Sequence, residues 1–347
     1  MIKKLALIGF TDNAKDRIAE IKSELPQDTE FLEYHKGDDL KTFVGKAFSD
    51  CDCLLFVSAM GIAVRSIAPY IRSKDKDPAV IVMDELGHNV IPVLSGHIGG
   101  ANEFALELSR ITGADPVITT GTDVNGKFAV DTWAVKNGFE ISDISKIKTI
   151  SSAVIRGDKV GIFIEASAEV SGEIPEELTL IKEGEAAPEI GIYVGVRTDS
   201  SPFRETLYIY PKALFLGAGC RKDLDPHIFG ETVRKLMSDQ GILIKAVSDL
   251  ATVDIKKEEP CMKMFCAEEG IGMITFTGEE LMEEEGDFSS SDFVKSVTGA
   301  DNVSERAAFR AARLAGGEPP LKVMKRTALN GLTLSVCERK WECRFDV

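Results

Sequence analysis

CLLFVSAMGIAVRSIAPYI (residues 53–71) places a short apolar run directly before a helix-like segment. The same succession occurs on both sides of it. KLALIGF (4–10) precedes AKDRIAEIKSEL (14–25), and AVIVMDE (79–85) precedes a helix expected from about Gly100 to Ile111. Such alternation predicts βαβ units and a mostly parallel sheet covered by helices. Residues 1–140 are therefore predicted to form an N-terminal α/β domain.

The alternation of strands and helices stops after this domain and resumes later in the chain. Residues 141–210 combine strand-like pieces with a polar loop rich in Glu, Ser and Pro, which predicts a small middle α+β domain. From Pro211 the βα pattern resumes, so residues 211–347 are predicted to be a C-terminal α/β domain. Its expected elements are a strand ALFLGAG (213–219), helices at 225–239, 255–267 and 304–316, a strand GMITFT (272–277) and closing strands LKVMKR (321–326) and LTLSVCER (332–339).

Composition limits the function classes. The net charge of -15 and the pI of about 4.9 argue against nucleic acid as the main partner, although local clusters of Lys and Arg could still bind a small anion. Because no stretch approaches the roughly 20 apolar residues of a membrane helix, and the N-terminus turns polar early, we expect a cytoplasmic protein without membrane contact. The seven cysteines are interpreted as reduced, buried residues, and no metal site in the protein is expected.

The turn after CLLFVSA is the first candidate for binding. Met60 and Gly61 form this turn, and Arg65 lies in the following helix. A glycine lets the backbone approach a ligand, and the free N–H groups of a helix N-terminus can bind an anion. Met60, Gly61 and Arg65 are therefore candidate substrate-binding residues. Ordinary turn geometry and a surface position for Arg65 remain the alternative.

VMDELGHNVIPVLSGHIGGANEFALEL (82–108) holds the densest set of candidates. Asp84 and Glu85 follow AVIVM, and His88 is assigned to a hairpin turn. A second group follows VIPVL and opens the next helix: Ser95, Gly96, His97, Gly99, Gly100 and Asn102. This composition predicts a binding loop, in which backbone amides could hold a carboxylate or oxyanion and His97 could transfer protons. The alternative is a glycine-rich turn with a helix-capping histidine.

Hydroxyl and carboxylate side chains follow another apolar run in PVITTGTDVNG (116–126). Thr119, Thr120 and Asp123 are the candidates there, alongside Thr122. They could hydrogen-bond a ligand at the end of a strand. The same residue types also form helix caps and Asx turns, so both interpretations stay open.

FLGAGCRKD (215–223) repeats the strand and glycine-turn pattern in the C-terminal domain. Gly217, Gly219, Cys220 and Arg221 are candidate substrate-binding residues, since backbone amides and a guanidinium suit carboxylates. Lys222 occupies the place of the third glycine in a dinucleotide fingerprint, which excludes nicotinamide binding. Cys220 could act as a nucleophile only with a base such as His227.

Taken in order, these motifs resemble one known family. The segment from SAMGIAVRS to TTGTDVNG (58–126) is similar to the N-terminal domain of cobalt-precorrin-5A hydrolases. The segments FLGAGCRKD, SDLATVDIKKEEP (248–260) and SVTGADNVSERAAF (296–309) resemble their C-terminal domain. SGHIGGAN and ITTGTD are the most specific parts of this resemblance.

The resemblance implies hydrolysis of the ring A δ-lactone of cobalt-precorrin-5A, with release of acetaldehyde to give cobalt-precorrin-5B in anaerobic cobalamin (vitamin B12) synthesis. It implies no cofactor, because the cobalt arrives within the anionic tetrapyrrole substrate. Transient contact with other enzymes of the pathway would fit. Basic residues must then face the substrate carboxylates, and the candidates are Arg65, Arg72, Lys74, Arg221 and Lys222.

Our mechanistic hypothesis is that His97 or Glu85, the latter next to Asp84, activates water against the lactone carbonyl. Amides near Gly99 and Gly100 would stabilise the oxyanion, and the C-terminal domain would bind or clamp the substrate. Two other classes remain: a non-catalytic carrier of cobalt tetrapyrroles, and a sugar-phosphate isomerase or similar phosphate-binding enzyme.

Overall fold

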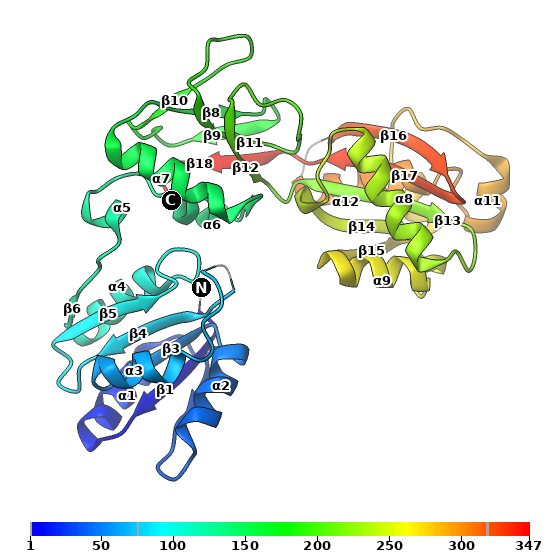
Figure 1. The fold of residues 1–347 in the computed structure, drawn as a ribbon. Coiled ribbons are helices and arrows are strands. Elements are labelled where there is room, and N and C mark those ends of the chain that lie inside the picture. Colours follow the sequence, from blue (N-terminus) through cyan, green and yellow to red (C-terminus); the bar gives the residue numbers. More distant parts are fainter. Residues whose placement is uncertain (1, 75, 317–318) are drawn as a thin grey trace. The chain divides into compact units, whose positions relative to one another are not determined.

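The computed structural model describes residues 2–74, 76–316 and 319–347. The chain divides into two compact units, Met1–Thr132 and Trp133–Val347, and each is considered by itself (Figure 1). Within the described residues, no helix is both long and apolar enough to cross a membrane.

The first unit is built on a six-stranded sheet with the order β2-β1-β3-β4-β5-β6. Its strands are β1 (Lys4–Gly9), β2 (Glu30–Glu33), β3 (Cys53–Val57), β4 (Ala79–Met83), β5 (Asn89–Leu94) and β6 (Asp115–Pro116). Strands β1 to β4 pair in parallel, which confirms the predicted parallel sheet. Strand β5 runs antiparallel to β4.

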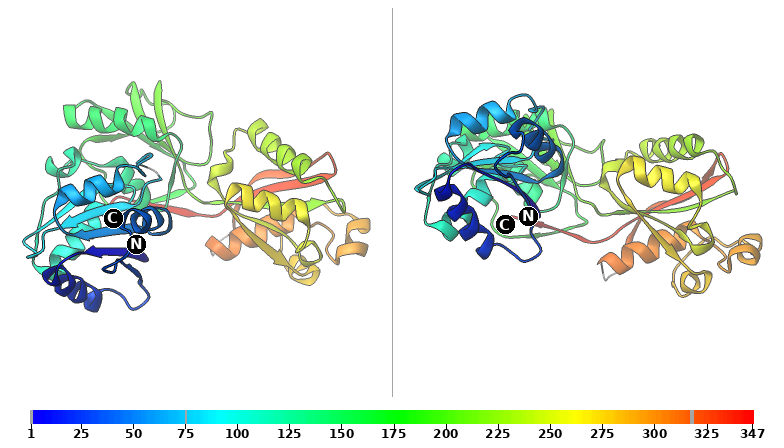
Figure 2. Two further views of the ribbon diagram at one scale, coloured as in Figure 1. Left: turned by 60° about the horizontal axis from the view of Figure 1, so that its bottom comes forward. Right: turned by 90° about the horizontal axis from the view of Figure 1, so that it is seen from below.

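Helices cover both faces of this sheet, as Figure 2 shows. They are α1 (Asp12–Glu24), α2 (Leu40–Asp50), α3 (Met60–Ile67) and α4 (Ala101–Thr112). Alternate residues of a strand point to opposite faces. Leu5 and Leu7 accordingly pack in the core with α1 and α4, whereas Ala6 and Ile8 pack with α2 and α3. The fully apolar central strands are therefore buried on both sides, as parallel sheets require.

The reversal at β4 and β5 decides which loops can meet. Met83, at the end of β4, pairs with Val90, and Val80 near its start pairs with Leu94 at the end of β5. The segment after β4 and the segment after β5 therefore leave the sheet at opposite edges. Five residues of β4 separate these edges, about 17 Å at the usual rise per residue.

A five-stranded sheet with the order β10-β8-β11-β12-β7 opens the second unit. Its strands are β7 (Glu140–Ile141), β8 (Val160–Ile164), β10 (Leu178–Leu180), β11 (Ile190–Val194) and β12 (Glu205–Tyr210). All pairs are parallel except β12 with β7. The buried residues of α7 (Ile147–Arg156) include Ile150 and Val154, which gives that helix an apolar face.

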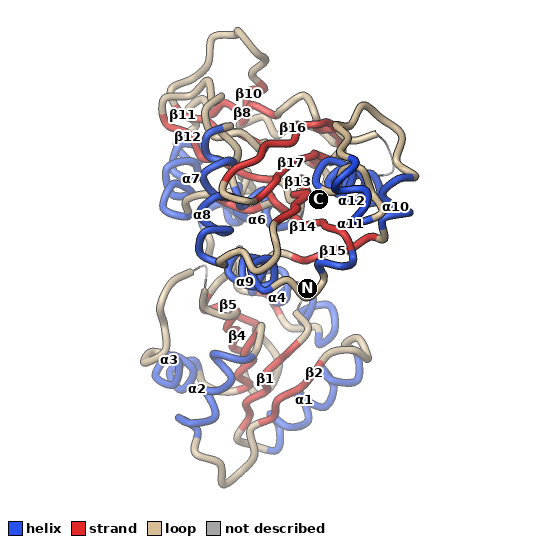
Figure 3. Tube along the Cα trace, turned by 90° about the vertical axis from the view of Figure 1, so that its right-hand side faces the viewer, coloured by secondary structure: helices blue, strands red, loops and turns tan. Residues whose placement is uncertain are grey.

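A second five-stranded sheet of this unit has the order β15-β14-β13-β17-β16, and its strands are drawn in red and labelled in Figure 3. Its strands are β13 (Leu214–Cys220), β14 (Val247–Val253), β15 (Gly272–Phe276), β16 (Leu321–Leu329) and β17 (Leu332–Glu338). The helices are α8 (Pro226–Asp239), α9 (Pro260–Glu269), α10 (Gly278–Met282), α11 (Asp292–Thr298) and α12 (Ser304–Gly316). The second helix starts later than the predicted residue 255 because Pro260 is tolerated only in a first turn.

The end of the chain returns to the earlier part of the unit. Strand β18 (Trp341–Arg344) pairs in parallel with β9 (Ala168–Ser171). The indole N–H of Trp133, in α6 (Val130–Lys136), donates to the backbone oxygen of Arg344 over 2.7 Å. The final strand thus lies with residues assigned from sequence to the middle domain. The predicted boundaries at 140 and 210 stay predictions.

Candidate functional site

His97 is held between two carboxylates in the first unit. Its Nε2 lies 2.8 Å from Oδ2 of Asp123, and its Nδ1 lies 3.0 Å from Oδ1 of Asp131. The side chains of His97 and Asp131 are 12% and 8% exposed, whereas that of Asp123 is 37% exposed. Of the two acids, Asp123 is therefore the one that a substrate could reach. We call His97, Asp123 and Asp131 the carboxylate clamp.

The clamp changes the protonation of the histidine. The hydrogen bond to Asp131 raises the pKa of His97 to about 9, with a further contribution from Asp123, although burial acts in the opposite direction. Burial would raise the pKa of Asp131, but the hydrogen bond and charge of His97 outweigh it and lower that pKa. At neutral pH His97 is therefore an imidazolium that donates both ring protons. It cannot serve there as a general base, which argues against the role expected from sequence.

The start of α4 adds an amide to the clamp. Asn102 Nδ2 donates to Oγ1 of Thr120 over 3.0 Å and to Oδ2 of Asp123 over 2.9 Å. Thr120 precedes α5 (Gly121–Val124), which carries Asp123, and Thr119 lies one residue earlier in the same loop. The structure thus brings together residues from the SGHIGGAN and ITTGTD motifs. Oδ2 of Asp123 accepts a hydrogen bond from Nε2 of His97 and another from Nδ2 of Asn102, and these two bonds fix the plane of the carboxylate.

Close packing explains the glycines of the loop before α4. A Cβ on Gly96 would lie 2.7 Å from Oδ1 of Asn102, and one on Gly99 would lie 2.5 Å from Cβ of Ser95. Ser95 itself has a φ of 56°, in the left-handed region that few non-glycine residues adopt. The hydroxyl of Ser95 donates to the backbone oxygen of Asp77 over 2.9 Å. The strained, tight loop holds His97 in position.

The backbone amides of this loop are largely used within it. The N–H of Gly100 donates to the oxygen of His97 over 2.9 Å, and that of Asn102 donates to the oxygen of Gly96 over 2.9 Å. The N–H of Gly100 thus already has an acceptor, which argues against this amide as an oxyanion donor. Gly100 has a φ of 78° and precedes α4 as a left-handed residue.

Asp84 and Glu85 do not join His97. They follow β4 and so lie at the edge of the sheet opposite the end of β5. Asp84 accepts the backbone N–H groups of Leu86, His88 and Asn89. Although burial acts the other way, these hydrogen bonds lower its pKa. Asp84 therefore organises the hairpin. Neither Asp84 nor Glu85, the base considered as the alternative to His97, lies at the edge of the sheet that carries His97.

Met60, Gly61 and Arg65 share the edge of Asp84. The N–H of Ser58, just before α3, donates to the oxygen of Met83 at the end of β4. Nη1 of Arg65 donates to the oxygen of Gly61 in its own helix over 3.2 Å. These three residues thus stand apart from the carboxylate clamp. They do not contribute to a site around His97.

The C-terminal candidates separate into two groups. Gly219, Cys220 and Arg221 line a cavity of about 680 Å³ at the end of β13. Gly217 is needed for packing instead, because a Cβ there would lie 1.8 Å from the backbone oxygen of Ser304. Helix α12 can approach β13 only over a glycine. A substrate-binding role for Gly217 is therefore replaced by a structural one.

Cys220 has a different partner from the one considered in the sequence. Its Sγ lies 3.8 Å from Sγ of Cys261, and this contact, together with burial, raises the pKa of Cys220. A neutral thiol paired with a second thiol is a poor nucleophile. Glu259 completes a group whose ligand atoms lie within 4.8 Å and could hold a cation. Lys256 already neutralises this carboxylate over 2.6 Å.

Sequence reasoning missed Asp131 and Cys261. Asp131 lies in the first turn of α6, where an acidic residue is expected to complement the helix dipole. Cys261 lies in α9, 41 positions after Cys220 in the chain. Only the folded chain brings these residues to their partners. No local pattern in the sequence distinguishes them.

Comparison with known families places all three parts of the chain. A model described as Cobalamin synthesis G N-terminal matches residues 42–123. A model described as Cobalamin biosynthesis central region matches 128–211, and Cobalamin synthesis G C-terminus matches 214–337. A protein of Salmonella typhimurium named cobalt-precorrin-5A hydrolase is 34% identical over 274 residues, which are 76% of this chain and 77% of that protein.

The chain belongs to the cobalamin synthesis G family. A second member of the family, from Priestia megaterium, is also named cobalt-precorrin-5A hydrolase and is 29% identical over 87% of this chain and 86% of its own length. A solved structure of a cobalamin biosynthesis protein G homolog from Sulfolobus solfataricus covers 97% of both chains at 22% identity, with a TM-score of 0.40. The family assignment agrees with the resemblance seen in the motifs and with the α/β fold.

Proposed function

We propose that the protein is a hydrolase that opens the ring A δ-lactone of cobalt-precorrin-5A and releases acetaldehyde, giving cobalt-precorrin-5B. The observation that carries this proposal is the 34% identity to a cobalt-precorrin-5A hydrolase over 76% of the chain. The carboxylate clamp supports it, because an exposed carboxylate beside a fixed positive charge suits hydrolysis of an ester-like bond. The cobalt belongs to the substrate.

Asp123 is the general base in this proposal, in place of His97 or Glu85. Its carboxylate takes a proton from water while the water oxygen attacks the lactone carbonyl. The ring C–O bond then breaks, which leaves a carboxylate and an alcohol on the macrocycle. His97 stays protonated and, with Asn102, orients Asp123 through hydrogen bonds of 2.8 and 2.9 Å.

Acetaldehyde leaves in the following step. The alcohol loses its O–H proton, its oxygen forms the aldehyde C=O, and the bond between the two-carbon fragment and the macrocycle breaks. The electron pair of that bond stays on the tetrapyrrole, which is an electron sink, and a proton restores neutrality. No external oxidant or reductant is needed, because the carbon that becomes the aldehyde is oxidised while the ring carbon that keeps the electron pair is reduced.

The direct test is anaerobic incubation of the purified protein with enzymatically prepared cobalt-precorrin-5A. Acetaldehyde is followed by coupling to alcohol dehydrogenase. We expect one acetaldehyde per substrate converted, and none after heat denaturation. A bound pigment that stays unchanged, without acetaldehyde, would replace the hydrolase by the carrier function, which the C-terminal cavity would serve equally well.

A further inference from the structure

A cavity in the second unit has no part in the carboxylate clamp. It lies at the carboxyl ends of β13 and β14, where ligands of parallel sheets gather. Helix α11 forms one wall, and residues near the turn between β16 and β17, such as Gly331, line another. The volume of about 680 Å³ falls within the range of roughly 300–1,000 Å³ that is typical of ligand sites.

The charge of the cavity is opposite to that of the protein. Arg221, Lys222 and Arg326 line it, and among the residues that the structure describes no carboxylate forms an ion pair with any of these three side chains. The acids on the wall are already paired. Glu259 binds Lys256, and Asp301 binds Arg306 over 2.8 Å. An excess of unpaired cations in a chain of net charge -15 indicates an anionic ligand with several negative groups.

One wall of the same cavity is apolar and unusually exposed. Phe293 and Val297, on α11, are 77% and 58% exposed, and Ile255 after β14 is also 58% exposed. All three line the cavity. Large apolar side chains grouped beside cations indicate a ligand with an apolar face and a charged rim.

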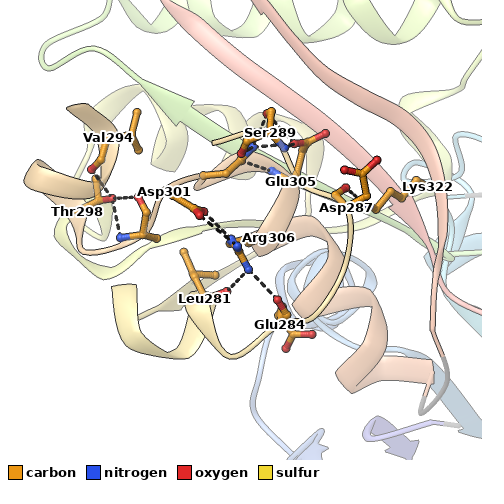
Figure 4. Close-up of polar contacts among 12 residues, drawn as sticks. Leu281, Glu284, Asp287, Ser289, Val294, Thr298, Asp301, Glu305, Arg306 and Lys322 are labelled. Carbon is orange, nitrogen blue, oxygen red and sulfur yellow. Dashed lines mark hydrogen bonds and ion pairs between the residues drawn. The ribbon is translucent and has the colours of Figure 1, made fainter. Parts of the chain in front are cut away.

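Buried charges at the start of α12 hold the cavity wall in shape (Figure 4). Oε2 of Glu305 accepts the backbone N–H and the hydroxyl of Ser289, as well as Nδ2 of Asn302. Arg306 binds Asp301 and the backbone oxygens of Leu281 and Glu284. Ser289, Asn302 and Asp301 all line the cavity. The segment that carries α11 is thus anchored at both ends before any ligand binds.

We propose that this cavity of the second unit is a binding site for a flat polycarboxylate of the tetrapyrrole class. The carboxylates of the ligand pair with Arg221, Lys222 and Arg326, and one face of its ring packs against Phe293 and Val297. The choice of tetrapyrroles among flat polycarboxylates rests on the proposed function. The inference of a binding site depends only on the charges and apolar residues of the cavity.

The experiment measures binding to the full chain by the change in the visible absorption of two probes. The first is cobyrinic acid, a cobalt corrin with free peripheral carboxyl groups, and the second is cobinamide, in which those groups are amides. The proposal expects cobyrinic acid to bind more tightly, with affinity that falls as salt rises. Equal binding of both probes would overturn the role of the cations.

Three variants locate the site. Arg221→Gln and Arg326→Gln should each weaken cobyrinic acid binding about tenfold, the size of one lost charge-assisted hydrogen bond. Phe293→Ser should weaken both probes. The matched control is Lys263→Gln, since Lys263 lies on α9 outside the cavity and pairs with Glu258. Unchanged affinity in all three cavity variants would place binding elsewhere.

The outcome is separable from that of the proposed function. If the wild-type protein binds cobyrinic acid through Arg221 and Arg326 but releases no acetaldehyde, the cavity stands and the hydrolase does not. If acetaldehyde is released with an unchanged KM in Arg221→Gln and Arg326→Gln, and these variants bind cobyrinic acid normally, the hydrolase stands and the cavity proposal is overturned.

Discussion

Nε2 of His97 lies 2.8 Å from Oδ2 of Asp123, although 26 positions separate the two residues in the chain. The strand pairing of β5 with β6 explains this contact. Both strands run in the same direction, with Asn89 opposite Asp115, so the segments that follow them leave the sheet at the same edge. The histidine therefore meets a carboxylate from the next motif and not the acids that precede it.

Asp123→Asn should lower the rate of acetaldehyde release by about 10²- to 10⁴-fold, the usual contribution of a general base. The amide retains the shape of the side chain but cannot take a proton from water. The measurement is the coupled aldehyde assay with cobalt-precorrin-5A. Asp115→Asn is the matched control, because Asp115 is an exposed acid on β6 outside the clamp. Equal rates for Asp123→Asn and wild type would remove Asp123 from the chemistry.

The stability of the first unit should fall as pH rises from neutrality. The pKa of His97 is about 9 in the folded protein against 6.5 for a free histidine. The interactions of protonated His97 with the two carboxylates contribute their full stability below pH 6.5, and this contribution is lost as the pH rises through 9. The loss is roughly 3 kcal/mol at most. Denaturant unfolding across this range measures it.

Asp131→Asn provides the comparison for this pH dependence. Removal of the buried carboxylate takes away the largest cause of the raised pKa of His97. We expect the variant to be less stable at neutral pH and to lose less stability on going from pH 6.5 to pH 9. A variant that kept the wild-type slope would show that the clamp does not control the protonation of His97.

Gly217→Ala should destabilise the second unit by about 3 kcal/mol or more, at the upper end of overpacking costs. The new Cβ would meet the backbone oxygen of Ser304, and backbone cannot yield as a flexible side chain can. Thermal unfolding measures the effect. In Gly230→Ala the closest atom to the new Cβ is Nη1 of the Arg234 side chain, 3.1 Å away, and Phe265 lies at an ordinary contact distance of 3.7 Å, so that variant should stay near wild type.

Arg306→Met should cost about 3 kcal/mol, because it leaves Asp301 and the oxygen of Glu284 without their buried donor. Denaturant unfolding again provides the measurement, and cobyrinic acid binding should weaken with it. Arg234→Met is the surface comparison. Arg234 pairs with Glu268 and Glu269 but is 42% exposed, so its loss should cost less than about 1 kcal/mol. Similar losses in both variants would contradict a special role for the buried network.

Sequence periodicity is sufficient for most of the architecture. The apolar runs at 4–10, 53–59 and 79–85 predict three central strands, because an all-apolar strand fits only a sheet covered on both faces. The hairpin around His88 is also readable from its turn. The sequence does not show the direction of β5 in the sheet. That direction decides whether Glu85 or Asp123 can approach His97.

Two kinds of residue separate the sequence predictions from the structure: glycines with a structural role, and residues that act through contacts between distant segments. Gly217 and Gly100 belong to motifs typical of ligand loops, but a glycine also serves wherever another backbone comes close or φ is positive. Only the position of Ser304 separates these cases for Gly217. Asp131 and Cys261 act through contacts between distant segments, and no spacing along the chain encodes such contacts.

The pairing of β18 with β9 makes the lobe of β13 to β17 an insertion. The chain leaves the sheet β10-β8-β11-β12-β7 after β12, and its last strand returns to β9, which lies between β8 and β10 in the sequence. Phe345 stacks on Trp133 with ring centroids 5.2 Å apart, and Trp341 meets Phe139 edge to face. A premature stop codon before residue 341 would therefore spare every proposed active-site residue. It would still expose the rings of Trp133 and Phe139. The inserted lobe would then be joined to the rest of its unit only by the segment that follows β12.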